Sequence, residues 1–292
     1  MNHYTGFHYT SRDGLRLHGR QYGSRDLPGV PAICLAGLTR NSADFDVLAR
    51  HLATDPESPR RVLTLDMRGR GGSERARDNA EYDVVVEATD ALDGMVAAGI
   101  EDASIVGTSR GAILAMAMAA IRPGVLHAVV MNDLGPVIEA AGLDEIRRYL
   151  ADAPSYESWS DAVAALRKGQ GTAFPALDEA QWERFARAIY TERDGRIVPA
   201  HDAGIHRTLE AVEPGTAPPA MWTAFAGLRA VPVLSIRGEL SSLFSAATQA
   251  EMRRRHPAFE AYTVPGQGHA PRLDDAGTID TIAGFLARHD RR

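Results

Sequence analysis

Gly107-Thr108-Ser109-Arg110-Gly111 is a G-x-S-x-G sequence that lies between two apolar runs. The run before it, residues 103–106, predicts a short buried strand, and residues 112–117 predict a packed helix. A strand that turns sharply into a helix at a serine holds the hydroxyl exposed at the tip of the bend. Glycine on both sides permits so tight a bend, so the pattern predicts a serine nucleophile at a strand–helix corner.

Strand-like and helix-like stretches alternate along most of the chain. Short apolar runs, typical of strands buried on both faces, lie at residues 15–22, 31–36, 61–66, 103–108, 126–131, 231–236 and 262–264. Helices are predicted between them at residues 43–52, 84–98, 111–121 and 278–288. This alternation predicts an α/β fold with a mostly parallel central sheet, helices on both faces, and a site at the carboxyl ends of the strands.

One long segment interrupts the alternation. From Ile138 to Gly227 no strand is predicted, and the segment reads as helical patches at residues 143–150, 159–166, 179–190 and 205–212. It starts after one sheet strand and ends before another. We therefore predict a helical lid over residues 138–227, inserted into a core made of residues 1–137 and 228–292.

Composition narrows the classes of function. The chain has 292 residues, 45% of them hydrophobic, which is enough for a full core with an inserted subdomain. Its formal net charge is −6 and no basic run dominates, so nucleic acid is not an expected partner. Cys34 is the only cysteine and lies in an apolar run, which predicts a small core residue rather than a nucleophile.

No targeting, membrane or metal-binding pattern is predicted. The first residues lack a basic region followed by an apolar run, and no stretch reaches the length of a membrane span, so we expect a cytoplasmic protein with no membrane partner. The histidines and carboxylates show no metal-ligand spacing, and the glycines at 69, 71 and 72 lack the ending of a phosphate loop. We expect no metal and no cofactor. The expected partner is a small-molecule substrate, and the oligomeric state is left open.

A histidine near the C-terminus is the candidate base. Serine needs a base to take its proton. Gly266-Gln267-Gly268-His269-Ala270-Pro271 follows the last strand candidate, so His269 falls at a strand's carboxyl end, where a base must sit to meet Ser109. The alternative is an ordinary histidine in a surface loop.

Two backbone N–H groups are the candidate oxyanion hole. One belongs to Arg110, because the residue after the nucleophile begins a helix whose first N–H groups lack partners. The other belongs to Leu38, in the loop after the strand at 31–36, where Gly37 permits close approach. This role uses only the main chain, so the side chain of Leu38 carries no information about it.

The order of these features resembles the α/β-hydrolase superfamily. Nearly the whole chain follows that order: a strand and Gly37-Leu38, the loop at 66–73, the serine corner, a helical insertion and a late Gly268-His269. The resemblance implies the α/β-hydrolase fold with a lid and a serine–histidine–acid triad. Two departures concern the oxyanion hole: Ala36 stands where many members carry histidine, and Arg110 is bulky where a small or apolar residue is common.

The third departure concerns the acid of the triad. The family usually takes it from the loop after the penultimate strand, but here Ser241 and Ser242 occupy the positions where aspartate is expected. Some members draw the acid from the strand that follows the nucleophile helix, and Asp133 stands at that place. Asp133 is therefore the predicted acid, which would fix the tautomer of the histidine. The alternatives are Glu239, a water or serine hydroxyl, no acid at all, or Asp133 as a simple turn cap.

The substrate-binding candidates are less specific. Arg40 follows the oxyanion loop, and Arg147 and Arg148 open the lid, so a guanidinium could grip a substrate carboxylate. The alternative for each is a solvated surface arginine. Trp222, among the lid aromatics, and Phe244, in the loop after the penultimate strand, are the apolar candidates.

These residues favour a serine hydrolase that cleaves a small carboxylic ester or lactone, with a carboxylate-bearing substrate in view, through an acyl-enzyme. Amide and carbon–carbon bond hydrolysis use the same residues and remain alternatives. The missing acid at Ser242 motivates a hypothesis of another class, a ligand-binding or receptor-like protein with a degenerate triad. A cofactor-free oxygenase or perhydrolase also shares the serine and histidine, and nothing in the sequence selects it.

Overall fold

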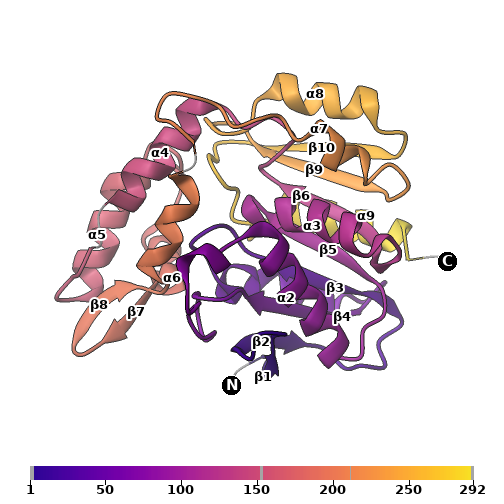
Figure 1. The fold of residues 1–292 in the computed structure, drawn as a ribbon, viewed down its shortest axis with the longest axis horizontal. Helices are drawn as coiled ribbons and strands as arrows, with labels where there is room; N and C mark the ends of the chain where they lie inside the picture. The colour runs from indigo at the N-terminus through magenta and orange to yellow at the C-terminus, as the bar shows by residue number, and fades with distance from the viewer. Residues whose placement is uncertain (1–2, 152–153, 211, 291–292) are drawn as a thin grey trace.

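The computed structural model describes residues 3–151, 154–210 and 212–290, and within them eight strands form one central sheet (Figure 1). The spatial order is β1-β2-β4-β3-β5-β6-β9-β10. The pairs β1/β2 and β2/β4 are antiparallel, and all the other neighbours are parallel. In chain order the strands are β1 (Thr5–Thr10), β2 (Arg16–Tyr22), β3 (Gly29–Leu35), β4 (Arg60–Asp66), β5 (Ala103–Thr108), β6 (Leu126–Asn132), β9 (Val233–Gly238) and β10 (Phe259–Val264).

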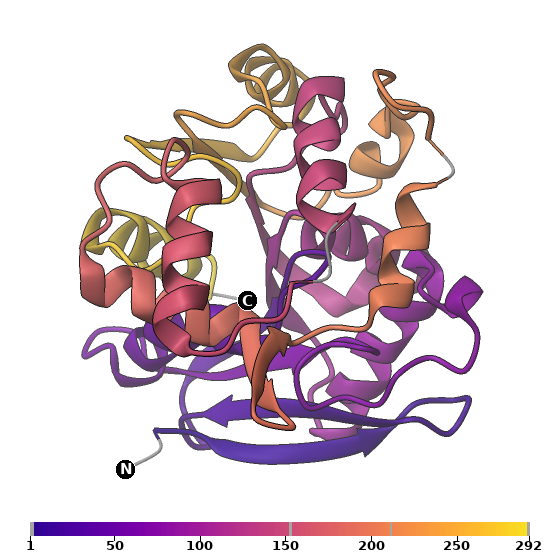
Figure 2. The same ribbon diagram turned by 90° about the vertical axis from the view of Figure 1, so that its left-hand side faces the viewer.

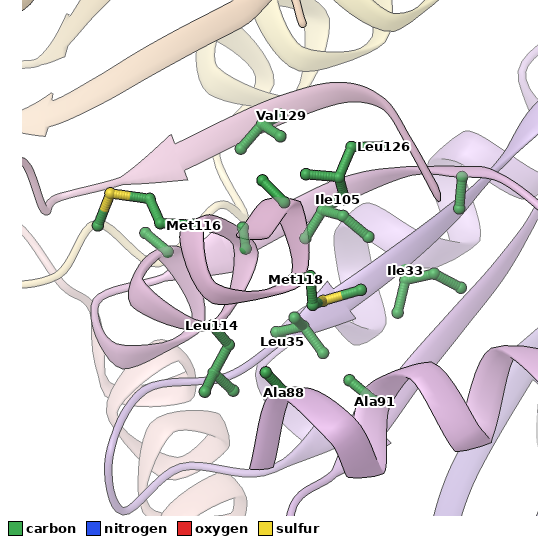
Figure 3. Close-up of a cluster of buried hydrophobic side chains, with 14 of the residues drawn as sticks. Ile33, Leu35, Ala88, Ala91, Ile105, Leu114, Met116, Met118, Leu126 and Val129 are labelled. Carbon is green, nitrogen blue, oxygen red and sulfur yellow. The ribbon is translucent and has the colours of Figure 1, made fainter. Parts of the chain in front are cut away.

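The central strands are buried on both faces because helices cover each side. Along β3, Ile33 and Leu35 join one hydrophobic cluster, while Ala32 and Cys34 join the other. This is the period-two alternation that a pleated strand imposes. The first cluster lies under α2 (Val84–Ala97) and α3 (Arg110–Ile121), as Figure 3 shows for Met116 and Met118 of α3. The second lies under α1 (Asp46–Thr54) and α9 (Ala276–Arg288). A further flanking helix, α8 (Ala246–Arg255), contributes Met252 to the first cluster.

A mostly helical insertion, residues 140–199, lies beyond the carboxyl ends of the parallel strands (Figures 1 and 2). It has a hydrophobic cluster of its own, built around Trp182, Phe185 and Phe174. Its elements are α4 (Ala140–Ala151), α5 (Trp159–Gln170), α6 (Glu179–Ile189), β7 (Tyr190–Arg193) and β8 (Arg196–Pro199). A 3-10 helix, Ala203–Leu209, leads the chain back toward the core.

The structure differs from the sequence-based prediction of secondary structure at three places. The segment predicted to lack strands contains the β7–β8 hairpin, whose turn is Asp194-Gly195 with both φ angles positive (51° and 71°). Such a turn matches the twist of two short antiparallel strands, and Asp-Gly is its usual sequence. The N-terminal strand β1 was not predicted, because it is an edge strand that is mostly exposed. The last helix of the predicted lid, α7 (Trp222–Ala226), packs on the core, since its Phe225 belongs to the cluster under α3.

Candidate active site

Ser109 lies at a corner that only small neighbours permit. β5 ends at Thr108 and α3 begins at Arg110, so Ser109 alone makes the bend, with φ 51° and ψ −114°. Positive φ is uncommon for a residue with a side chain, and such strain occurs mainly at functional positions. A Cβ on Gly107 would lie 2.5 Å from the backbone of Gly111, and one on Gly111 would lie 2.0 Å from the Leu35 carbonyl oxygen. Both glycines are therefore required by the packing of the corner.

A chain of hydrogen bonds runs from the serine to a histidine and a carboxylate. Nε2 of His269 lies 2.9 Å from Oγ of Ser109, and Nδ1 lies 2.8 Å from Oδ2 of Asp133. Ser109 follows β5, Asp133 follows β6 and His269 lies in the loop after β10, so three carboxyl ends of one sheet supply the three groups. Ser109 is 8% exposed and Asp133 is fully buried. This arrangement can move a proton from the hydroxyl to the imidazole while the carboxylate orients the ring.

The Asp133 carboxylate is held by the loop in which an acid was expected. Oδ1 accepts from the N–H of Gly238 at 2.7 Å, and Oδ2 accepts from the hydroxyl of Ser241 at 2.6 Å. Ser241 in turn accepts from the N–H groups of Leu243 and Phe244. The serine in the usual acid position thus donates to an acid that comes from β6. The sequence analysis considered a serine hydroxyl only as a substitute for the acid, not as a donor to it.

Glu239 faces away from the histidine. Its side chain is exposed, and its Oε2 accepts from the N–H of Gly266 at 2.8 Å. Glu239 thus braces the loop that leads to the histidine. Of the two carboxylates considered, Asp133 is the one that contacts His269.

The two N–H groups expected to stabilise an oxyanion lie beside the serine. Arg110 is the first residue of α3, so its N–H has no partner within the helix. The N–H of Leu38 donates to no protein acceptor within the described residues. A Cβ on Gly37 would lie 3.7 Å from Cβ of Ser109, which shows how closely this loop passes the nucleophile.

The serine and histidine open on a cavity of about 630 Å³ between the core loops and the insertion. This volume is in the range of sites for small molecules. The core side of the cavity includes Leu38 and Arg40. The insertion side is largely apolar, with Ile146, Tyr149, Leu150, Leu166 and Phe185.

Two arginines of the cavity flank one aromatic ring from the insertion. The guanidinium carbon of Arg40 lies 4.8 Å from the ring centroid of Phe185, and that of Arg272 lies 4.7 Å from it. Each guanidinium also binds a carboxylate of its own loop: Arg40 binds Asp44, and Arg272 binds Asp274. Arg272 was missed by sequence reasoning, although its place three residues after His269 puts it on the loop of the base.

The other four substrate-binding candidates do not line the cavity. Arg147 donates to Asp144 and to backbone carbonyls near the 3-10 helix, because α4 turns that side chain away from the core. Arg148 is exposed on the same helix. Trp222 lies under the guanidinium of Arg255 at 4.0 Å, since α7 packs on the core. Phe244 is fully buried in the core cluster, so it is closed off from a ligand.

The loop that carries His269 is attached to the insertion. The N–H of Gly268 donates to the carbonyl oxygen of Ala173 at 2.7 Å, and Ala173 lies between α5 and α6. A Cβ on Gly268 would lie 2.7 Å from that of Ala173, so the two backbones meet without room for a side chain. The position of His269 therefore depends on contacts with the insertion as well as with the sheet.

The α/β hydrolase family model matches residues 32–281. The chain belongs to the α/β hydrolase family. This hydrolase is 29% identical to the 3-hydroxybutyrate-oligomer hydrolase of Cupriavidus necator, over 92% of this chain and 93% of the relative. It is 30% identical to the 2-(acetamidomethylene)succinate hydrolase of Mesorhizobium japonicum, over 93% and 92%. Among solved structures it resembles an α/β hydrolase from Novosphingobium aromaticivorans, with a TM-score of 0.89 and 39% identity over 99% of both chains.

Membership of this hydrolase family makes the protein an enzyme, so the receptor-like alternative is not retained. The mostly parallel sheet with flanking helices agrees with the fold that the sequence predicted. No helix among the described residues is long and apolar enough to cross a membrane. Those residues also contain no group of three or more His, Cys, Asp or Glu side chains placed to hold a metal ion.

Proposed function

We propose that this α/β hydrolase is a serine hydrolase that cleaves a small carboxylic ester or lactone through an acyl-enzyme. The observation that carries the proposal is the hydrogen-bonded series from Ser109 through His269 to Asp133, which opens on a small-molecule cavity. Nucleophile and base within hydrogen-bond reach, with the base oriented by a third group, are the signature of an activated nucleophile.

The geometry supports a two-step reaction. The Ser109 oxygen attacks the ester carbonyl while its proton passes to Nε2 of His269, and Asp133 stabilises the imidazolium that forms. The negative charge that develops on the carbonyl oxygen is bound by the N–H groups of Leu38 and Arg110. His269 then gives its proton to the departing alcohol. In the second step a water molecule, activated by the same histidine, releases the acyl group and restores the serine.

The substrate class that we propose is an ester of a hydroxy acid with a free carboxylate. One relative is named as a hydrolase of 3-hydroxybutyrate oligomers. On this chain, the bonds to Asp44 and Asp274 use the Nε and Nη2 donors of Arg40 and Arg272. A guanidinium has five N–H donors, so each arginine keeps Nη1 for a ligand carboxylate.

Hydrolysis of 3-hydroxybutyrate dimer tests both parts of the proposal. The wild type is expected to cleave the dimer with kcat/KM at least tenfold above that of the dimer methyl ester, whose terminal charge is removed. Ser109→Ala is expected to cleave neither, and mass spectrometry of the quenched wild type is expected to show an acyl adduct on Ser109. Equal rates on the two compounds would remove the carboxylate from the proposal. Undiminished turnover by Ser109→Ala would remove the serine mechanism.

Hydrolysis of an amide or of a carbon–carbon bond is the second candidate. A relative named for 2-(acetamidomethylene)succinate favours it, and a solved structure with that name has a TM-score of 0.81 and 26% identity to this chain. A panel of matched ester, amide and β-diketone substrates separates the candidates. Preference for the amide or the diketone, measured as kcat/KM and lost in Ser109→Ala, would replace the ester in the proposal.

A further inference from the structure

A buried ion-pair chain links the helix of the nucleophile to the loop of the oxyanion hole. Glu87, on α2, is fully buried and binds two arginines, one with each carboxylate oxygen. Its Oε2 lies 2.6 Å from Nε of Arg110, and its Oε1 lies 2.6 Å from Nη1 of Arg70. Arg70 is 1% exposed. One carboxylate therefore joins two guanidinium groups from different parts of the sequence.

The two ends of this chain reach the two donor residues. Nε of Arg70 donates to the carbonyl oxygen of Leu38 at 2.8 Å, which fixes the orientation of that residue's backbone. At the other end, Arg110 is itself the residue whose N–H faces the serine, and its Nη2 donates to the carbonyl of Tyr82 at 2.9 Å. The distance between the two oxyanion donors is thus set by side chains as well as by the sheet.

The cost of burying these charges points to a role beyond stability. A buried ion pair rarely stabilises a fold more than well-packed apolar side chains of similar volume would. Two guanidinium groups and one carboxylate also leave one net positive charge, adjacent to both donor residues. Hydrogen-bonded groups in a low-dielectric interior do, however, hold a single geometry, which a preorganised oxyanion site requires.

We propose that Glu87 is a positioning residue for the oxyanion hole: it holds Arg70 and Arg110 so that the N–H groups of Leu38 and Arg110 converge on one point. The large side chain after the nucleophile is the means of this coupling. The inference rests on the proposed serine mechanism, and it adds a residue on α2 that does not line the cavity.

The chain offers a matched control on the same helix. Asp90 lies one turn beyond Glu87, is 2% exposed, and binds Arg68 through Nε at 2.7 Å and Nη2 at 2.9 Å. The Arg68 side chain continues to Asp13 and Glu81 and, within the described residues, to neither donor residue. Glu87→Gln and Asp90→Asn therefore remove similar buried charges, but only the first breaks the connection between the donors.

The test compares kcat, KM and transition-state binding in these variants. With a small aryl ester, Glu87→Gln is expected to lower kcat by about 10- to 100-fold and to leave KM within threefold. Phenylboronic acid forms a tetrahedral adduct with the serine, and its affinity is expected to fall in proportion to kcat. Asp90→Asn is expected to keep kcat within threefold of wild type. A kcat of Glu87→Gln within twofold of wild type, or equal losses in both variants, would overturn the proposal.

The direction of the change in kcat distinguishes a role of Glu87 in positioning from a role of its charge alone. Glu87→Gln makes the site more positive, so a role limited to charge would raise kcat, whereas a positioning role lowers it. If Glu87→Gln does not fold, Arg110→Met takes its place, because it leaves the Arg70 pair intact. It is expected to lose about tenfold in kcat, with partial recovery in Arg110→Lys. Unchanged kcat in Arg110→Met would refute the inference.

Failure of the serine mechanism would look different. Fluorophosphonate labelling of Ser109 in the wild type reports on the nucleophile alone, whatever the natural substrate is. A wild type that is not labelled would refute the proposed function. A labelled wild type with Glu87→Gln labelled equally fast would refute only the positioning role.

Discussion

Asp133→Asn is expected to trap His269, the proposed base, in the wrong tautomer. Asparagine at 133 must place its oxygen on one side and its NH₂ group on the other, with the Gly238 N–H on the first side and His269 and the Ser241 hydroxyl on the second. The backbone N–H of Gly238 already donates to the Oδ1 side, so an NH₂ group there would leave two buried donors facing each other. The Ser241 hydroxyl can rotate its hydrogen away, whereas the Gly238 N–H is fixed by the backbone, so the oxygen stays toward Gly238 and the NH₂ group faces Nδ1 of His269. The imidazole then carries its proton on Nε2, where it cannot accept the proton of Ser109.

The magnitude follows from the same geometry. The alternative orientation, which would preserve the correct tautomer, costs about 1–3 kcal/mol because of the unpaired Gly238 N–H. Loss of the correct tautomer in a serine–histidine–acid site costs about 10⁴-fold in kcat, or about 5.5 kcal/mol of activation free energy. Asparagine is one of the residues that tolerate a positive φ, so the backbone at 133, with φ 55°, is expected to stay as it is.

The assay is steady-state hydrolysis of a small aryl ester by the wild type and Asp133→Asn, with Glu239→Gln as the matched carboxylate control. We expect a loss of about 10⁴-fold in kcat for Asp133→Asn. Glu239→Gln is expected to stay within a few-fold of wild type, because in the described part of the chain its carboxylate hydrogen-bonds only to the Gly266 N–H. A folded Asp133→Asn enzyme within tenfold of wild type would refute the tautomer argument. A large loss in Glu239→Gln with Asp133→Asn unaffected would reassign the acid.

Three further predictions use other contacts. Ser241→Ala removes one hydrogen-bond donor from the Asp133 carboxylate and is expected to lower kcat about tenfold, because a hydrogen bond to a charged group is worth about 1.5–3 kcal/mol. A pre-steady-state burst with wild-type amplitude and rate would contradict this prediction. Gly111→Ala places a Cβ 2.0 Å from a backbone oxygen of β3, so we expect it to unfold the protein or to lower its melting temperature by more than about 10 °C. Gly124→Ala is the control, because its Cβ meets nothing within 4 Å and the variant should melt as the wild type does. The pKa of Asp13 is lowered to about 2, chiefly by its hydrogen bond to Arg68, so this pair stabilises the fold above about pH 4 and its contribution is lost as the pH falls toward 2. Acid unfolding of Asp13→Asn, followed by circular dichroism, is expected to depend less on pH in that window, and a curve parallel to that of wild type would argue against it.

The parts of the site that depend on local sequence are visible without the structure. The corner at Ser109 needs glycines at fixed offsets, so a short pattern identifies it. The histidine loop stands out because His269 follows glycines at the end of a strand. Asp133 needed a further step, since its place depends on which strands are neighbours: β6 lies between β5 and β9 in the sheet.

The remainder depends on contacts between distant residues. Arg147 and Trp222 lie outside the cavity because the packing of α4 and α7 decides where their side chains point. Glu87 gave no signal in the sequence, because its partners Arg70 and Arg110 come from two other elements. The β7–β8 hairpin is the exception. Asp194-Gly195 is a local turn signal, but the prediction of a helical segment did not take it into account.

The hydrogen bond between Gly268 and Ala173 has a consequence for attempts to re-engineer specificity. Exchange of the whole 140–199 segment for the corresponding segment of another α/β hydrolase is an obvious way to change substrates. In this enzyme such a graft would also remove the support under the residue next to His269. A chimera that keeps the new pocket but lacks a carbonyl at that place is expected to bind its ligand and turn it over slowly. Successful grafts should therefore carry over the short backbone stretch around position 173 unchanged.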